Sequence, residues 1–263
     1  MGACSVPGIR HRRPLPPTLV TAIAIQFATF AANATDEIQV YNASIAPLHT
    51  FTLEQHLNYV WNGSQTPEFA GGFASYHSLN GTPEIAYGIT PWYEMGWYVP
   101  FSIDSNGTFL PAGFKWRHLF VAPNAEKRNI FYGLNIELGY LTPNFAASPF
   151  NIEFRPILGM RDSGWEFIIN PIIETSFGST GQSDFAPAAR IARVVAEDVM
   201  VGVEYYGDFG PVGNFSPASQ QSQSLFGVVD FSAFSLDIEF GVGFGLTEAS
   251  DKIVTKLIVG HTF

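Results

Sequence analysis

The sequence predicts an all-β fold, a closed antiparallel transmembrane β-barrel of about twelve strands. Three observations predict it. Residues 234–263 alternate apolar with small or polar side chains and end on an aromatic residue, Phe263. Aromatic residues make up 15% of the chain and charged residues only 14%. Beyond residue 34 no apolar run is long enough for a membrane helix. Because only helices and closed barrels satisfy their backbone groups in lipid, the pattern favours a barrel.

The two C-terminal strands show the alternation best. One face of residues 234–246 carries Phe234, Leu236, Ile238, Phe240, Val242, Phe244 and Leu246. The other carries Ser235, Asp237, Glu239, Gly241, Gly243 and Gly245. A turn at 247–251 follows, and residues 253–263 repeat the period. Successive side chains of a strand point to opposite faces, so one face is suited to lipid.

The N-terminus has the features of a secretory signal. Arg10, Arg12 and Arg13 precede an apolar stretch, and Ala32-Asn33-Ala34 gives a small-x-small cleavage site. We expect residues 1–34 to be a cleaved signal peptide and the mature chain to start near Thr35. Residues 35–47 would form an N-terminal segment, a possible plug of the lumen, and residues 48–263 the barrel.

Charge and cysteine content exclude several functions. Removal of the signal leaves 10 basic against 23 acidic residues, a net charge of −13. This balance gives no basic stripe, so we expect no nucleic-acid partner. Cys4, the only cysteine, leaves with the signal, which rules out disulfides and thiolate–metal sites.

The remaining strands follow in order, each ended by a turn signal. The first covers 51–61, and a long bent strand is expected over 69–89. The others are expected at 93–101, 114–120, 130–140, 150–158, 165–173, 185–195, 199–205 and 225–231. The Ala-rich run 185–195 could be drawn as a helix, but its flanking strands favour a strand with Arg190 inward. Strand ends rich in Tyr and Trp would form girdles at the headgroups.

The connections suggest an orientation. With both termini in the periplasm, the short connections 90–92, 121–127, 161–164, 196–198 and 232–233 would face inward. The connections 62–68, 104–108, 142–148, 178–182, 208–221 and 247–251 would face outward, as outer-membrane barrels prefer. The segment 208–221 is the longest of these and the candidate lid. A soluble β-sandwich or lipocalin-like barrel is the alternative fold.

If the apolar face meets lipid, the opposite face lines the lumen. We expect it to carry Glu54, His56, Glu94, Lys115, Arg117, Glu137, Glu153, Arg155, Glu166, Glu174, Arg190, Glu204, Asp230, Asp237, Glu239 and Lys256. Such groups could form a salt-bridged interior that holds a closed barrel rigid, or the wall of a narrow cation-preferring passage. The inward glycines 241, 243 and 245 could leave room for a plug or a solute, or let the sheet curve.

The pattern predicts no catalytic site. No Gly-x-Ser-x-Gly motif surrounds any serine, although some outer-membrane barrels hydrolyse lipids with a Ser–His pair. His77, beside Ser75 and Ser78, is the best remnant of such a set, and a plain strand-end histidine explains it better. No His, Asp and Glu cluster shows metal-ligand spacing in the sequence. We therefore expect no enzyme, no metal site and no cofactor.

Three stretches carry a family resemblance: residues 83–100, residues 201–211, and residues 241–251 with the closing strand. Together they resemble the phenol-degradation meta-pathway outer-membrane protein family of transporter-like barrels. The resemblance implies a barrel for passive uptake of small, often hydrophobic or aromatic, molecules in a Gram-negative outer membrane. It supplies no substrate residue to carry over. Phe263 is similar to the terminal signal that barrel-assembly machinery reads, so lipid, that machinery and a solute are the expected partners. A closed structural or surface-recognition barrel is the alternative, and no oligomeric state follows from the pattern.

Overall fold

The computed structural model describes residues 37–178 and 181–263. It has sixteen strand segments and one 3-10 helix, η1. The segments are β1 Phe51–Asn62, β2 Leu79–Thr90, β3 Tyr93–Tyr98, β4 Phe101–Ile103, β5 Phe109–Pro111, β6 Gly113–Val121, η1 Ala125–Lys127, β7 Ile130–Leu141, β8 Phe150–Asp162, β9 Trp165–Asn170, β10 Ile173–Phe177, β11 Ser183–Phe185, β12 Ala188–Ala196, β13 Val199–Asp208, β14 Ser222–Ala233, β15 Leu236–Gly245 and β16 Ile253–Thr262.

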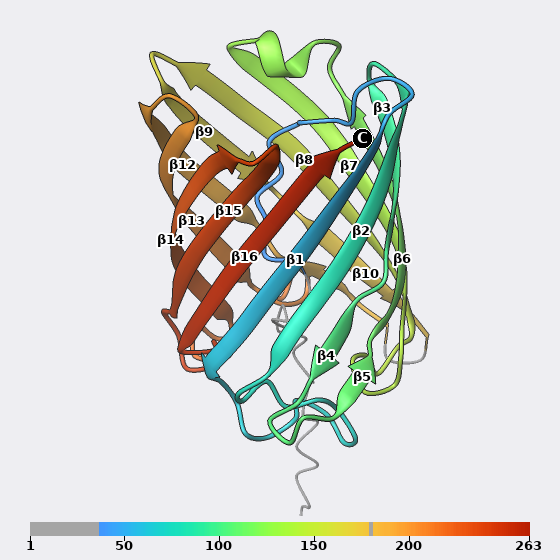
Figure 1. Ribbon diagram of the computed structural model, residues 1–263. Helices are drawn as coiled ribbons and strands as arrows, with labels where there is room; N and C mark the ends of the chain where they lie inside the picture. The colour runs from blue at the N-terminus through green and yellow to red at the C-terminus, as the bar shows by residue number, and fades with distance from the viewer. Residues whose placement is uncertain (1–36, 179–180) are drawn as a thin grey trace, which may run out of the picture.

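These segments form the predicted closed barrel of twelve antiparallel strands (Figure 1). Neighbouring strands pair in chain order, and β1 closes the barrel by pairing with both β2 and β16. Four barrel strands are each split into two segments: β3 with β4, β5 with β6, β9 with β10, and β11 with β12. Three of the breaks contain a proline, Pro100, Pro171 or Pro187, which cannot donate a hydrogen bond to the ladder.

The apolar face of the strands points outward. Trp116 and Phe154 are exposed, whereas their inward neighbours Lys115, Arg117, Glu153 and Arg155 are buried. A large exposed apolar surface that covers every strand suits lipid and not water. In the described residues no helix is long and apolar enough to cross a membrane.

Several strand boundaries differ from the sequence prediction. The bent strand 69–89 is wrong in its first half, because residues 63–78 form a connection and β2 begins at Leu79. This connection contains two adjacent glycines and a left-handed residue, His77, and its Phe73 N–H donates to the Asn144 carbonyl. It is longer than the 209–221 connection, so the expected lid is not the longest loop. Arg161 belongs to β8 and not to a turn.

The strand expected to start at Phe234 begins two residues later. Phe234 and Ser235 form the two-residue turn between β14 and β15, both with positive φ. Such turns match the twist of a hairpin but normally use Gly or Asn, so the sequence hides this one. Phe234 is 97% exposed at the tip of the turn.

Candidate functional site

The interior of the barrel holds the charged side chains that the alternation places there. The five predicted inward bases, Lys115, Arg117, Arg155, Arg190 and Lys256, are all buried and ion-paired. Buried charges are stable only when they are paired and hydrogen-bonded, so each base fixes a set of carboxylates.

Arg190 is the centre of the largest group. Its guanidinium lies 2.8 Å from Glu204 Oε1, 3.3 Å from Glu239 Oε2 and 3.6 Å from Glu166 Oε1, and it also contacts Asp230. Lys256 pairs with Glu204 and Glu239 from the other side. The register explains the group, since Arg190 faces Glu204 across β12–β13 and Asp230 faces Glu239 across β14–β15.

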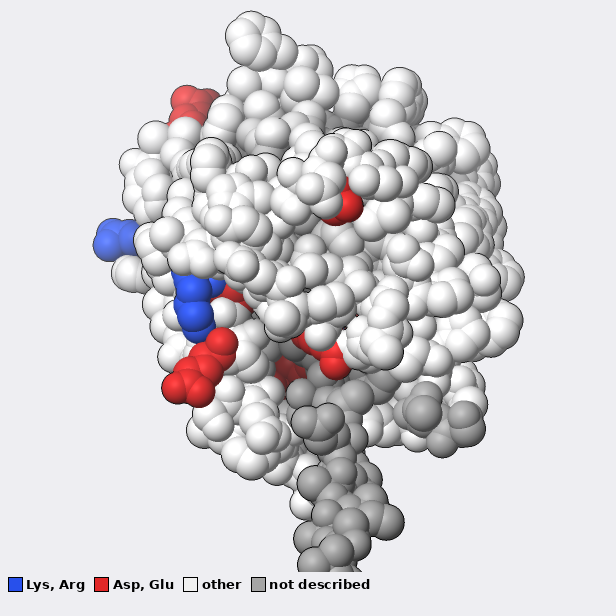
Figure 2. Space-filling model, turned by 90° about the horizontal axis from the view of Figure 1, so that it is seen from below, with Lys and Arg blue, Asp and Glu red and all other residues white. Residues whose placement is uncertain are grey.

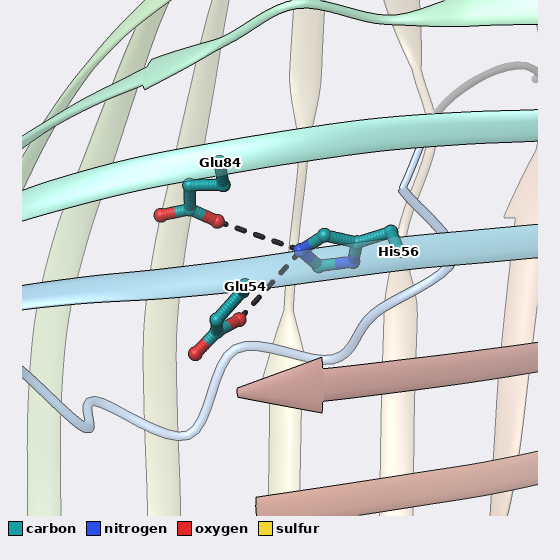
Figure 3. A group of neighbouring side chains, drawn as sticks. All are labelled: Glu54, His56 and Glu84. Carbon is teal, nitrogen blue, oxygen red and sulfur yellow. Dashed lines mark ion pairs between the residues drawn. The ribbon is translucent and has the colours of Figure 1, made fainter. Parts of the chain in front are cut away.

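A second group joins β1, β2, β3 and β6. Arg117 bridges Glu84 and Glu94. Next to it, His56 Nε2 lies 3.4 Å from Glu84 Oε2 and 3.6 Å from Glu54 Oε2, and the three side chains point toward one another (Figure 3). Their candidate ligand atoms all lie within 4.8 Å of one another, so sequence spacing was a poor guide to metal-ligand geometry here.

The third group lies on β6, β7 and β8. Arg155 makes a two-pronged contact with Glu153, with Nε at 2.7 Å and Nη2 at 3.2 Å from its two oxygens. Lys115 Nζ lies 3.4 Å from Glu137 and 3.8 Å from Glu37 of the N-terminal segment. Paired cations and anions of this kind make the middle of the lumen rigid.

The other predicted lumen residues differ in their burial and in their partners. Glu166 is buried and bound by Arg161, and Glu174 accepts a hydrogen bond from Asn151 Nδ2 at 2.7 Å. Asp237 is exposed at the start of β15, where it accepts a hydrogen bond from Ser232, its partner on β14. Asp237 therefore lies at the rim of the barrel and not among the buried charges.

Residues 37–46 run through the interior, and residues 47–50 pass over the rim of the barrel into β1. The segment contacts β16 at Ile38 and β9 at Tyr41, and the Tyr41 hydroxyl lies 2.6 Å from that of Tyr98 on β3. Contacts with strands all round the barrel place it inside the lumen, where Figure 1 shows it in blue. Its Val40, Tyr41 and Ala43 share a buried apolar cluster with inward residues of the wall: Leu119, Val121, Phe131, Ile157, Ile168, Ile172 and Ala188.

Side chains of the wall bind the backbone carbonyl and N–H groups of this segment. Lys256, Arg155 and Arg161 donate to the carbonyls of Ile38, Gln39 and Asn42 at 3.0, 3.3 and 3.1 Å. Glu94 accepts from the Ala46 N–H. Gly88 packs against the segment so closely that a Cβ there would lie 2.3 Å from the Pro47 carbonyl oxygen. Charged groups that bind main-chain atoms satisfy both partners in a dry interior.

Next to this segment a cavity of about 200 Å³ occupies the half of the lumen farther from Phe263, the lower half in Figure 1. Ile38 and Gln39 form part of its floor with Lys115 and Arg155. Its wall is mixed, with apolar side chains beside serines and carboxylates: Leu141, Phe145, Ile172, Tyr206, Phe226, Ser148, Ser176, Ser222, Ser224, Glu174, Asp184, Asp208 and Asp251. Acidic side chains are visible within the hollow at this end of the molecule (Figure 2). The cavity can hold a small molecule and favours cations over anions at its mouth.

Asp251 ties two connections together at this mouth. It accepts hydrogen bonds from Ser75 Oγ at 2.6 Å and from the Ser64 N–H at 3.3 Å. Burial raises the pKa of Asp251 above its ordinary value, and these hydrogen bonds partly oppose the shift. The link fixes the 63–78 connection beside the 246–252 connection.

The inward glycines of β15 serve close packing. A Cβ on Gly243 would lie 2.3 Å from the Phe226 ring, and one on Gly241 would lie 3.0 Å from Lys256 Cε. These glycines therefore make room for neighbouring side chains of the wall, including one that lines the cavity. From the sequence, these glycines were expected to leave space for a plug or a solute, or to let the sheet curve.

Several site residues were missed from the sequence. Glu84 is a buried inward position, and Tyr41, Tyr98 and Tyr206 contribute hydroxyls to the interior. Glu84 could have been found from the alternation Thr82, Glu84, Ala86 once β2 was placed correctly. Tyr41 has no such signal, because its segment is not a strand.

Comparison with known proteins supports the fold. The chain matches an outer membrane channel from Pseudomonas putida F1 with a TM-score of 0.58 at 10% identity, over 86% of this chain and 100% of that one. Other matches are OprD from Pseudomonas aeruginosa (TM-score 0.38, 10% identity, 81% and 66% covered) and LpxR from Salmonella typhimurium (0.42, 6% identity, 81% and 99% covered). No protein-family model and no curated protein matches the sequence. The chain has the fold of an outer-membrane β-barrel.

The sequence-based prediction that the chain is not an enzyme is wrong, because it rested on missing motifs alone and one fold can carry many different functions. Membership of this fold therefore does not exclude catalysis.

Proposed function

We propose that the protein is an outer-membrane channel or transporter for passive uptake of small molecules, in which residues 37–47 act as a plug. The observation that carries the proposal is the cavity, which lies inside a closed barrel and has Ile38 and Gln39 in its floor. A solute that enters this cavity meets the N-terminal segment. Passage then requires the segment to shift within the lumen or to leave it.

The solute class that we favour is small and apolar or aromatic. Phe145, Tyr206 and Phe226 give the cavity aromatic surface beside its serines and carboxylates. Aromatic walls that carry placed polar groups are typical of sites for small organic ligands. The resemblance to the phenol-degradation meta-pathway family points to the same class. The acidic groups at the mouth would favour neutral or cationic solutes over anions.

The orientation follows from the connections. The turns at the Phe263 end are short, including the two-residue turns at 163–164 and 234–235, whereas 63–78 and 209–221 lie at the opposite end. Outer-membrane barrels have short periplasmic turns and longer extracellular loops. The cavity would thus open outward, and Phe263 would be read by the assembly machinery in the periplasm after export by the N-terminal signal, which lies outside the described residues.

Single-channel conductance in planar bilayers tests the proposal. The chain from Thr35 onward would be compared with a deletion of residues 37–46 and with Gly88→Ala, whose new methyl group displaces Pro47 from the wall. We expect small or rare openings from the parent and larger, longer openings from both variants. Gly227→Ala is the matched control, because a Cβ there meets nothing within 4 Å.

A closed structural barrel is the second candidate, and the buried ion pairs and the packed N-terminal segment favour it. On this alternative the deletion variant folds, as shown by heat-modifiable gel migration, yet conducts no more than the parent. That result would overturn the channel proposal.

A further inference from the structure

Glu54 and Glu84 are directly opposite one another on β1 and β2, where two like charges face each other across the sheet. Such cross-strand pairs of like charge destabilise a sheet unless a cation lies between them. His56, two residues beyond Glu54 on the same face of β1, directs its imidazole at both carboxylates (Figure 3).

The polar atoms of this cluster are not satisfied by the protein. His56 is 1% exposed, and neither of its ring nitrogens has a hydrogen-bond partner among the described residues. Glu84 Oε2, which faces the imidazole, is equally without a hydrogen bond. Buried polar atoms almost always have a partner, so an unpartnered imidazole that faces two carboxylates indicates a missing ligand.

The charges around the cluster also favour a cation. Arg117 contacts Oε1 of Glu84 and Oε1 of Glu94, which leaves Oε2 of Glu84 directed at His56. Three carboxylates, Glu54, Glu84 and Glu94, then face one guanidinium. With a neutral imidazole two negative charges remain, and one divalent cation balances them.

We infer that Glu54, His56 and Glu84 bind one divalent transition-metal cation, zinc being the probe of choice. The ligand atoms are Glu54 Oε2, His56 Nε2 and Glu84 Oε2, which lie within 4.8 Å of one another. Zinc bonds of about 2.0–2.2 Å in a tetrahedral site place ligand atoms about 3.4 Å apart, close to the 3.4 and 3.6 Å that His56 makes. A nitrogen with two carboxylates suits zinc or its first-row neighbours better than magnesium.

The surroundings support such a site. Arg117 holds the second oxygen of Glu84, as outer groups orient metal-ligating carboxylates. Gly260 of β16 lies beside Glu54, where a Cβ would be 3.4 Å from Glu54 Cγ, so this glycine leaves space for the side chain to turn inward. Glu54 is partly exposed, which gives an ion a route to the site. The metal would join β1 to β2 next to the strand pair that closes the barrel.

Zinc titration of the folded chain, carrying no polyhistidine tag and stripped with chelator, tests the inference by calorimetry. We expect one equivalent to bind and to raise the thermal unfolding midpoint, and magnesium not to compete. Glu54→Gln and His56→Gln should each weaken zinc binding by at least roughly 10–100-fold. That is the loss in metal affinity typical when a group that only hydrogen-bonds to a ligand is replaced. Cobalt in place of zinc should give visible absorption that both variants lose.

His118→Gln is the matched control, because His118 lies outside this cluster and bonds to the Tyr93 hydroxyl through Nδ1. It should bind zinc as the parent does. Absence of stoichiometric zinc binding by the parent would overturn the inference, and so would binding that persists unchanged in His56→Gln. A variant that fails to show heat-modifiable migration is replaced by Glu54→Ala, whose exposed side chain is the least constrained of the three.

Discussion

Asn170 on β9 binds the backbone of Tyr41 at two points. Its Oδ1 accepts from the Tyr41 N–H at 2.8 Å, and its Nδ2 donates to the Tyr41 carbonyl at 3.1 Å. The amide thus pairs with both main-chain groups of one residue, as a residue of a neighbouring antiparallel strand would. Together with the three bases that donate to carbonyls of residues 38–42, it anchors the main chain of the N-terminal segment, while Val40, Tyr41 and Ala43 pack in the apolar cluster.

Replacing Asn170 by Ala should loosen this segment. The change removes both hydrogen bonds and leaves a buried N–H and a buried carbonyl without partners, at a cost of about 1–3 kcal/mol for each group that water does not reach. Hydrogen exchange of residues 38–46 should become faster by the corresponding factor while β1 and β16 stay protected. Asn151→Ala is the control, since Asn151 bonds to Glu174 and not to the segment. Unchanged protection of Tyr41 in Asn170→Ala would show that the apolar cluster alone fixes the segment.

Arg190→Met should destabilise the barrel strongly. Four carboxylates on β9, β13, β14 and β15 would lose their shared partner, and removing one member of a buried ion pair costs about 3–5 kcal/mol. The midpoint of unfolding, followed by heat-modifiable migration, measures the effect. Arg193→Met provides the comparison on the same strand, because Arg193 is exposed and lies over the Trp165 ring. Equal midpoints for the two variants would contradict a structural role for the Arg190 group.

Two aspartates in the connections should respond to pH in opposite directions. The pKa of Asp251 is raised by burial, so the stability due to its protonated form is present below its ordinary pKa of 3.8 and is lost as pH rises through the folded value. The pKa of Asp104 is lowered, chiefly by the hydrogen bond from the Thr108 N–H, so its contribution is present above pH 3.8 and is lost as pH falls. The protection of backbone amides against hydrogen exchange, measured for residues 63–78 and 104–108 between roughly pH 3 and 7, reports the stability of each loop.

Asn in place of each aspartate should remove the corresponding pH dependence, since the amide keeps an acceptor oxygen and does not titrate. Asp251→Asn should keep the 63–78 connection protected at neutral pH. Asp104→Asn should leave its own loop less protected there than in the parent. Shifts of the same sign in both loops would show that general charge, and not these two groups, controls the exchange.

The barrel and its charged interior could be predicted because strand alternation fixes which side chain points inward. Arg190 is the best example. Its inward position followed from the period of residues 185–195, and its partners Glu204, Asp230 and Glu239 followed from the same period on three later strands. Local pattern was sufficient there, because cross-strand register brings successive inward positions together.

The rest of the interior depends on contacts that produce no periodic pattern in the sequence. Tyr41 lies in a segment that is neither strand nor helix, and its position is set by Asn170, Tyr98 and the apolar cluster. The cluster of Glu54, His56 and Glu84 needs the register of β1 on β2, and the sequence placed the start of β2 ten residues too early. Phe234 was assigned to a strand because neither turn residue is Gly or Asn.

Phe240 and Phe234 provide a matched test of which residues meet lipid. Phe240 is exposed on the outer face of β15, six positions from the Phe234 turn, which is itself almost fully exposed at the barrel rim. In a membrane, Phe240→Arg should cost about 2–4 kcal/mol, because arginine near the bilayer midplane loses its hydration, and Phe234→Arg should cost about 0–1 kcal/mol at the interface. Folding into lipid vesicles during urea titration measures both variants against the parent. Equal costs would contradict the assignment of the outer face to lipid, since a water-exposed strand would accept arginine at either position.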